Sequence, residues 1–177
     1  MQIDDCFQTL PATDPQWYAI FTMPRHEKFV AKSFEQRQIE CFLPVYEKLS
    51  SWKNRQRVNV MLPLFPRYIF AWIDRPQRLQ VLQTSGVIRI VGAGSSPTPL
   101  PDAEIEFLRT AADRKRVEPY PDLVVGNRVC VKRGPMAGIE GVLVRKQNGT
   151  RFILTLQLIQ QSVSIEIGAE DLETLQS

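Results

Sequence analysis

The sequence predicts an α+β fold in which a mixed domain of strands and helices precedes a small all-β domain. Residues 16–116 alternate short aromatic or β-branched runs with helical patterns, whereas residues 123–177 contain four strand-like runs in succession. Residues 117–122 (VEPYPD) separate them and contain two prolines, which is typical of a linker. Residues 1–15 lack periodicity and are expected to form a flexible leader.

The mixed domain begins with a predicted strand, a helix and a second strand. Residues 17–22 (WYAIFT) are aromatic and β-branched, as expected for a buried strand. Residues 25–38 are rich in Lys, Glu, Gln and Ala and place Val30 and Phe34 four positions apart, which indicates an amphipathic helix. A strand is expected over 41–47.

A long strand, a helix and a short strand are predicted next. Pro63 and Pro66 restrict the first half of the strand over 60–73 to an edge or a bulge. The segment Asp74-Arg75-Pro76 is a helix-start signal for residues 77–84, and 87–91 (VIRIV) has the pattern of a strand.

The mixed domain closes with a loop and a helix. Residues 92–101 contain glycines and prolines and predict the loop. Asp102 is positioned to cap the helix, which carries Ile105, Leu108 and Ala112 on one side at spacings of three and seven.

The second domain is predicted to be a small barrel. A hairpin turn is expected at Asn148-Gly149, because this dipeptide favours the backbone twist that tight hairpins need. The predicted strands cover 124–132, 140–146, 151–158 and 162–167.

Composition and charge limit the protein's class. Hydrophobic residues make up 44% and charged residues 23% of the 177-residue chain, as in soluble globular proteins. The net charge of +3 is carried by residues 1–116, which hold 16 basic and 12 acidic side chains, whereas residues 117–177 hold 6 and 7. Any nucleic-acid contact is therefore expected to be local and to involve the first domain.

No membrane or secretory segment is expected. The most apolar segment, 60–73, is interrupted by two prolines and an arginine, and the N-terminus lacks the basic and apolar regions of a signal peptide. Cys6, Cys41 and Cys130 are odd in number and far apart, which favours reduced thiols over a disulfide framework or a zinc site. We expect a cytoplasmic protein, monomeric, with no cofactor.

Catalytic signatures are nearly absent. His26 is the only histidine, and the segment it opens lacks the second histidine that a helical zinc-peptidase motif needs. No phosphate loop or nucleophile elbow follows a strand. The sequence therefore predicts no catalytic residue, no metal ligand and no enzymatic activity.

Two segments are candidates for binding. Residues 48–58 form a predicted hairpin tip that contains no acidic residue. Its Arg and Lys side chains could contact phosphates and Trp52 could stack on a base. Alternatively, the segment is simply a solvated loop. Residues 64–72 (LFPRYIFAW) hold more large aromatics than one strand face buries easily, so they form either a partner surface or part of the core. The basic residues of the tip are Lys53, Arg55 and Arg57.

A glycine-rich turn between two strands resembles the KOW motif. It runs over 126–144, and its characteristic residues are Gly126, Gly134, Pro135, Gly138 and Gly141. The chain over 17–175 is similar to NusG-family transcription factors, whose signature matches Trp17-Tyr18, the LFPRYIF segment from Leu64, and Gly86-Val87. This resemblance implies an NGN domain with an antiparallel sheet flanked by helices, followed by an SH3-like KOW barrel.

The resemblance also implies partners. NGN domains of this family bind the clamp helices of bacterial RNA polymerase through a hydrophobic patch and thereby suppress pausing. In this sequence the patch would comprise Phe21, Phe65, Tyr68, Phe70 and Ile90.

Nucleic acid is the second implied partner. The hairpin tip would approach upstream DNA, and residues 77–80 would face the opposite jaw of the polymerase. Arg37, Thr84 and Ser85 match positions that lie near the exposed non-template strand in the paralogue RfaH.

Departures from the housekeeping pattern favour a specialised RfaH/UpxY-like paralogue, acting as an operon-directed antitermination factor. Arg67 stands where general members have Gly, and 158–162 (LIQQS) lacks the exposed aromatic that housekeeping KOW domains present to a ribosomal protein and to the termination factor Rho. That loss puts Rho binding in doubt. A housekeeping role, or an RNA- or ribosome-binding KOW protein, is the alternative.

The fold of the KOW domain has an alternative as well. Residues 153–159 (ILTLQLI) are compatible with a helix packed on the NGN domain as well as with a strand. The β-branched residues at 163–167 and the Gly-Pro turn favour the barrel.

Overall fold

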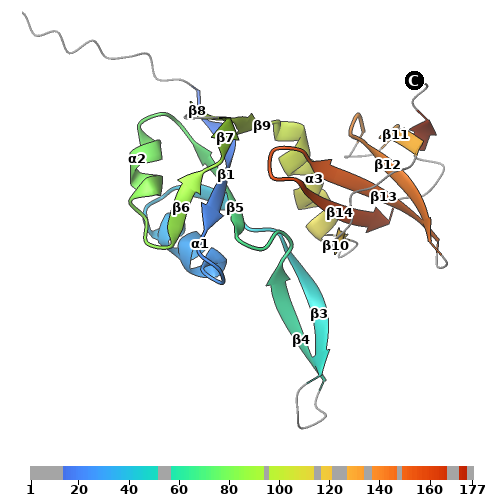
Figure 1. The fold of residues 1–177 in the computed structure, drawn as a ribbon, viewed down its shortest axis with the longest axis horizontal. Coiled ribbons are helices and arrows are strands. Elements are labelled where there is room, and N and C mark those ends of the chain that lie inside the picture. Colours follow the sequence, from blue (N-terminus) through green and yellow to red (C-terminus); the bar gives the residue numbers. More distant parts are fainter. Residues whose placement is uncertain are drawn as a thin grey trace, which may run out of the picture.

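The computed structural model describes residues 14–51, 57–93, 96–113, 117–120, 127–133, 137–146, 149–166 and 172–174. Figure 1 shows two bodies, one built on each of two β-sheets, with helix α3 between them and a two-stranded ribbon that projects from the first. We call them the N-terminal domain and the C-terminal β-domain. None of the described helices is both long and apolar enough to cross a membrane.

The elements of the N-terminal domain follow the predicted order, except that the strand predicted over 41–47 is split into two strands and the loop predicted over 92–101 contains three short strands. Its strands and helices are β1 (Gln16–Thr22), α1 (Glu27–Gln36), β2 (Glu40–Phe42), β3 (Val45–Ser51), β4 (Arg57–Pro63), β5 (Tyr68–Ile73), α2 (Gln77–Leu82), β6 (Val87–Ile90), β7 (Gly92–Ala93), β8 (Ser96–Pro97), β9 (Pro99–Leu100) and α3 (Asp102–Asp113).

The main sheet has the strand order β2-β5-β1-β6, with β9 also paired to β1, and every pairing is antiparallel. Side chains alternate across a strand, so the β1–β5 register places Ala19 opposite Phe70 on one face and Ile20 opposite Ile69 on the other. The face with Ile20 packs against α1 and α2, where Val30 and Phe34 are fully buried. The i, i+4 pair predicted from sequence is thus the core contact of α1.

The long strand predicted over 60–73 is two strands. β4 ends at Pro63 and pairs with β3 in a separate ribbon, whereas β5 starts at Tyr68 and pairs with β1 and β2. Arg67, directly before β5, has a φ of 70°, which breaks the extended chain and redirects it into the main sheet. The tip of the ribbon, residues 52–56, lies outside the described residues.

Helix α3 is apolar on two sides. Ile105 and Leu108 form the predicted stripe and are buried in the same cluster as the sheet residues Trp17 and Ala19. Phe107, about 100° away on the helix, is only 1% exposed because its ring lies 5.6 Å from the ring of Phe152 in the C-terminal β-domain. One hydrophobic cluster therefore runs from the sheet through α3 into the second domain.

The C-terminal β-domain is a six-stranded antiparallel sheet within the described residues, in the order β10-β14-β13-β12-β11-β15. Residues 153–159, compatible with either a strand or a helix in sequence, are extended in β13 up to Leu156 and continue as a turn. The strands are β10 (Val117–Tyr120), β11 (Asn127–Val131), β12 (Glu140–Lys146), β13 (Gly149–Leu156), β14 (Gln161–Glu166) and β15 (Leu172–Thr174).

The predicted linker is wrong over residues 117–120. These residues form β10, which pairs with β14 from Val117 opposite Ile165 to Tyr120 opposite Ser162. Pro119 misled the prediction, yet proline is compatible with a strand at the edge of a sheet, where β10 lies. The β-domain therefore begins at Val117.

Two positions of the KOW-like turn require glycine for different reasons, one for its backbone conformation and the other for lack of space. Gly138 has a φ of +89° and donates its N–H to the carbonyl of Val131, so the backbone turns back onto β11. At Gly141 a Cβ would lie 2.5 Å from the carbonyl oxygen of Ile153 and closer still to Cζ of Phe152. Gly141 therefore makes room for the ring that contacts Phe107. Gly126, Gly134 and Pro135 lie outside the described residues.

We expect Gly141→Ala to destabilise the chain more than Gly138→Ala. The added methyl at position 141 meets backbone and a buried ring at distances that force both to move, which costs about 3 kcal/mol or more, whereas at 138 it meets open space and adds only a backbone penalty of about 1–2 kcal/mol. Urea unfolding of both variants measures the difference. Equal losses would contradict the role given to the close approach at Gly141.

Candidate protein- and nucleic-acid-binding surface

The face of the main sheet opposite α1 and α2 is lined with aromatic rings, and we call it the aromatic face. The register brings the rings together in pairs, with Trp17 opposite Trp72 at 5.5 Å and Phe21 opposite Tyr68 at 5.2 Å between ring centroids. Phe70 lies between these pairs and stacks on Phe42. The aromatic face comprises Trp17, Phe21, Phe42, Tyr68, Phe70 and Trp72.

One end of the aromatic face is covered by α3. The guanidinium of Arg109 lies 4.9 Å from the Trp17 ring and 5.4 Å from the Phe42 ring, and its Nη2 is 3.1 Å from Glu40 Oε1. These contacts fix the end of α3 over the sheet and leave Trp17 buried.

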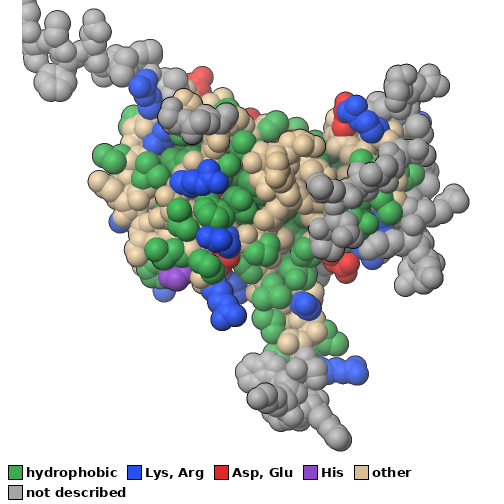
Figure 2. All heavy atoms as spheres, in the orientation of Figure 1, with side chains coloured by type: hydrophobic (Ala, Val, Ile, Leu, Met, Phe, Trp, Pro, Cys, Tyr) green, Lys and Arg blue, Asp and Glu red, His purple; other side chains and the backbone are tan. Residues whose placement is uncertain are grey.

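The other end of the aromatic face is open. Phe21 and Tyr68 are half-buried, and the guanidiniums of Arg67 and Arg89 lie 4.2 and 5.4 Å from the centroid of the Phe21 ring. Figure 2 shows basic side chains among hydrophobic ones over β1, β5 and β6. This end combines apolar area with positive charge, which is the chemistry of a surface for an acidic protein partner or a polyanion.

Hydrogen bonds from Arg67 to Glu27 and Thr22 hold its left-handed backbone conformation in place. Its N–H donates to Oε1 of the buried Glu27 at 2.7 Å, and its Nε donates to the Thr22 carbonyl at 3.4 Å. The left-handed φ of 70° is a conformation that favours glycine, so an arginine at this position carries a backbone cost. The Glu27 bond offsets part of the backbone cost and aims the Arg67 side chain over Phe21.

The five residues expected to form the polymerase patch are not all on one surface. Phe21 and Tyr68 are accessible on the aromatic face, whereas Phe65 and Phe70 are 1% and 0% exposed and support it from beneath. Ile90 pairs with Ile20 and packs with the opposite face of the sheet. The structure therefore separates Ile90 from the other four.

The residues expected near nucleic acid lie at two places. Arg57 is exposed at the start of β4 on the projecting ribbon, while Trp52, Lys53 and Arg55 lie outside the described residues. On the helical side, Ser85 is exposed and Arg37 Nη1 donates to the Gln80 carbonyl at 3.0 Å.

Thr84, grouped with Arg37 and Ser85 in sequence, is not available for contact. Its side chain is 3% exposed, and its hydroxyl donates to the Gln80 carbonyl at 2.9 Å. Thr84 thus closes the end of α2, and Arg37 reaches the same carbonyl.

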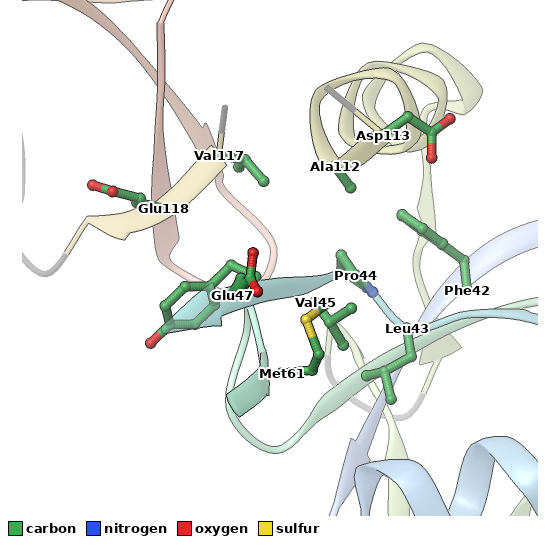
Figure 3. Close-up of a pocket in the computed structure, with 11 residues that line it drawn as sticks. Phe42, Leu43, Pro44, Val45, Glu47, Met61, Ala112, Asp113, Val117 and Glu118 are labelled. Carbon is green, nitrogen blue, oxygen red and sulfur yellow. The ribbon is translucent and has the colours of Figure 1, made fainter. Parts of the chain in front are cut away.

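A groove of about 520 Å³ lies between the base of the ribbon, the end of α3 and β10 (Figure 3). Pro44, Val45 and Met61 give it apolar walls. Glu47, Asp113 and Glu118 also line it, which makes it unsuitable for a nucleic-acid backbone.

Within the described part of the chain, the cysteine thiols and the side chains able to bind a metal are not arranged as a site. Cys41 and Cys130 are free, and burial, followed by the nearby charges of Glu35 and Glu40, raises the pKa of the Cys41 thiol to about 11. Cys41 is therefore a protonated, poorly nucleophilic thiol at neutral pH. Among the described residues, no group of three His, Cys, Asp or Glu is arranged to hold a metal ion.

Comparison with known proteins places this arrangement in a family. The family model NusG, described as "Transcription termination factor nusG", matches residues 15–109. The "Transcription termination/antitermination protein NusG" of Deinococcus radiodurans is 30% identical over 72% of this chain and 82% of its own length. This chain belongs to the NusG family. The protein of the same name from Staphylococcus aureus is 27% identical over 90% of this chain and 96% of its own length.

A solved structure supports the fold of the NusG-family chain beyond the segment that the family model matches. The structure titled "Domain interaction in Thermotoga maritima NusG" aligns with a TM-score of 0.56 and 20% identity over 92% of this chain and 98% of that chain. The relatives carry the names of transcription factors, and the whole aromatic face of this NusG-family protein lies within residues 15–109.

Three residues that build the aromatic face or the contact between the domains of this NusG-family protein were not identified from sequence. Arg89 lies on β6 and reaches Phe21 only through the pairing of β6 with β1, and Glu27 reaches Arg67 across 40 positions of sequence. Phe107 carried a usable signal, because with Ala111 four positions later it forms a second apolar side of α3.

We expect Glu27→Ala to destabilise this NusG-family protein by about 1–3 kcal/mol, because it leaves the Arg67 N–H without its acceptor and frees a strained backbone. Glu27→Gln keeps an oxygen acceptor and should cost clearly less. Urea unfolding measures both, and NMR chemical shifts of Arg67 and Tyr68 report the local change. Equal costs for the two variants would show that the hydrogen bond is not what holds Arg67.

Proposed function

We propose that this protein is a transcription elongation and antitermination factor that binds the clamp helices of bacterial RNA polymerase through the open end of its aromatic face. The observation that carries the proposal is the half-buried Phe21–Tyr68 pair beneath the guanidiniums of Arg67 and Arg89. The pair lies within the segment that defines the NusG family.

The physical chemistry of this end suits a protein anchor. Aromatic and Arg side chains carry most of the binding energy in protein interfaces, because they bury a large area and lose little conformational freedom. Phe65 and Phe70 are buried below and hold the pair rigid, with the Phe65 ring edge-on to Phe70 at 5.7 Å. Binding would then remodel little of the domain.

Basic side chains away from the anchor are proposed to contact DNA. The ribbon that carries Arg57 projects from the domain, as Figure 1 shows, and would approach upstream DNA. Arg37 and Ser85 would face the non-template strand on the helical side. Such contacts stabilise the elongating state relative to the paused state by differential binding, without any catalytic step.

Within this function we favour an operon-specific role in the cytoplasm over a housekeeping one. The turn between β13 and β14 presents the exposed residues Gln157 and Gln160, with Ile159 buried, and so offers Rho no exposed aromatic. A ribosomal protein remains the proposed partner of this domain. Purely RNA-binding activity is disfavoured by the net charge of −1 over 117–177, which holds 6 basic and 7 acidic residues.

We expect the double variant Phe21→Ala and Tyr68→Ala to bind bacterial RNA polymerase at least about tenfold more weakly, because two anchors of the interface are lost. The matched control is Phe29→Ala, which removes a ring that is 53% exposed on α1, on the opposite side of the sheet. Binding is measured by titration of labelled protein with core polymerase, after circular dichroism shows that each variant is folded. Unchanged affinity of the folded double variant refutes the anchor.

Operon specificity is tested by single-round transcription on templates with and without the leader of the protein's own operon. We expect shorter pauses and more terminator read-through on the native leader alone, because recruitment would require an element in that leader. An equal effect on every template would indicate a housekeeping factor. No effect on either template would favour the RNA-binding alternative.

A further inference from the structure

The C-terminal β-domain docks on the second apolar side of α3. Phe107 packs on Phe152, and Glu104, one turn earlier on the same side, lines a cavity of about 400 Å³ together with β-domain residues that include Val142 and Leu154. Glu104 is therefore the carboxylate that α3 contributes to the docking interface, and the β-domain side of the cavity presents both apolar residues and the Arg128–Glu140 ion pair.

The carboxylate of Glu104 lacks a full set of partners. Its Oε2 is buried and has no hydrogen-bond partner among the described residues, and burial raises the pKa of Glu104 above its ordinary value of 4.5. An ionised carboxylate with an unsatisfied buried oxygen opposes the burial that surrounds it.

The charged groups nearby do not neutralise Glu104. Arg128 on β11 lines the same cavity but is bound to Glu140 on β12, with Nη2 2.7 Å from Oε2. On α3, Asp102 and Glu106 are exposed and acidic, and Glu106 lies 3.7 Å from Arg109. The other polar residues that line the cavity, Thr155 and Gln157, are uncharged.

We propose that Glu104 is a release element, whose negative charge weakens docking of the C-terminal β-domain on α3 and so keeps the two domains able to separate. The proposal goes beyond the proposed function, because it concerns the contact between the domains and holds whatever the aromatic face binds. Separation exposes Phe107 on α3, an apolar ring that the docked β-domain covers.

The direction of the pH dependence follows from linkage. The docked chain holds the Glu104 proton more tightly than the open chain, in which the side chain is solvated. Docking is therefore strongest below the ordinary pKa of 4.5 and weakens as the pH rises through the higher pKa of the docked state. The weakening is complete once the pH exceeds the raised pKa of the docked state, and each unit of pKa elevation lowers the docked-to-open ratio by about tenfold.

The test uses the full chain labelled with ¹⁵N. Backbone relaxation gives a rotational correlation time for each domain, and docked domains share one value whereas open domains have two shorter ones. In the unmodified protein we expect the correlation times to converge as the pH is lowered from about 7.5 to about 5. Glu104→Gln should show convergence at both pH values, because its side chain stays neutral.

Glu106→Gln is the matched control, since it removes the same charge from an exposed position two residues away. It should behave like the unmodified protein. The proposal is overturned if Glu104→Gln and the unmodified protein give the same correlation times at both pH values, or if Glu106→Gln reproduces the effect of Glu104→Gln. Because this experiment measures docking, a negative result refutes the role of Glu104 without bearing on polymerase binding. A failure of the proposed polymerase binding likewise leaves the role of Glu104 untouched.

Discussion

The antiparallel pairing of β1 with β5 is the interaction on which the rest of the structure depends. Its register places Phe21 opposite Tyr68 and Ile20 opposite Ile69, so aromatic and aliphatic side chains separate onto opposite faces. A shift of one residue would exchange the two faces and expose the aliphatic core of α1 and α2. The aromatic face is therefore a consequence of the same pairing that builds the core.

Helix α3 connects this sheet to the second domain. One side of it, with Ile105 and Leu108, belongs to the core of the N-terminal domain, and the other side, with Phe107, belongs to the docking interface. The β-domain meets it through Phe152, whose position requires the absence of a side chain at Gly141. The glycine of the KOW-like turn and the contact between domains are thus physically linked.

Charged side chains have opposite effects at the aromatic face and at the docking interface. Arg67 and Arg89 lie at the open end of the aromatic face, where their guanidiniums add attraction for a partner to the apolar area of Phe21. Glu104 lies in the docking interface, where its buried oxygen has no hydrogen-bond partner among the described residues and so opposes docking. The first surface is suited to hold a partner and the second to release one.

The sequence by itself determined the order of the elements, the amphipathic side of α1 and the all-β character of the second domain, because periodicity and turn residues act locally. The tertiary structure alone decided where β4 ends and β5 begins, since Arg67 takes a left-handed backbone there and donates its N–H to Glu27, 40 positions away in sequence. It also decided that the proline-containing segment at 117–120 is an edge strand, and that Ile90 faces away from Tyr68. These outcomes depend on pairing between segments that are distant in sequence, and no local pattern encodes such pairing.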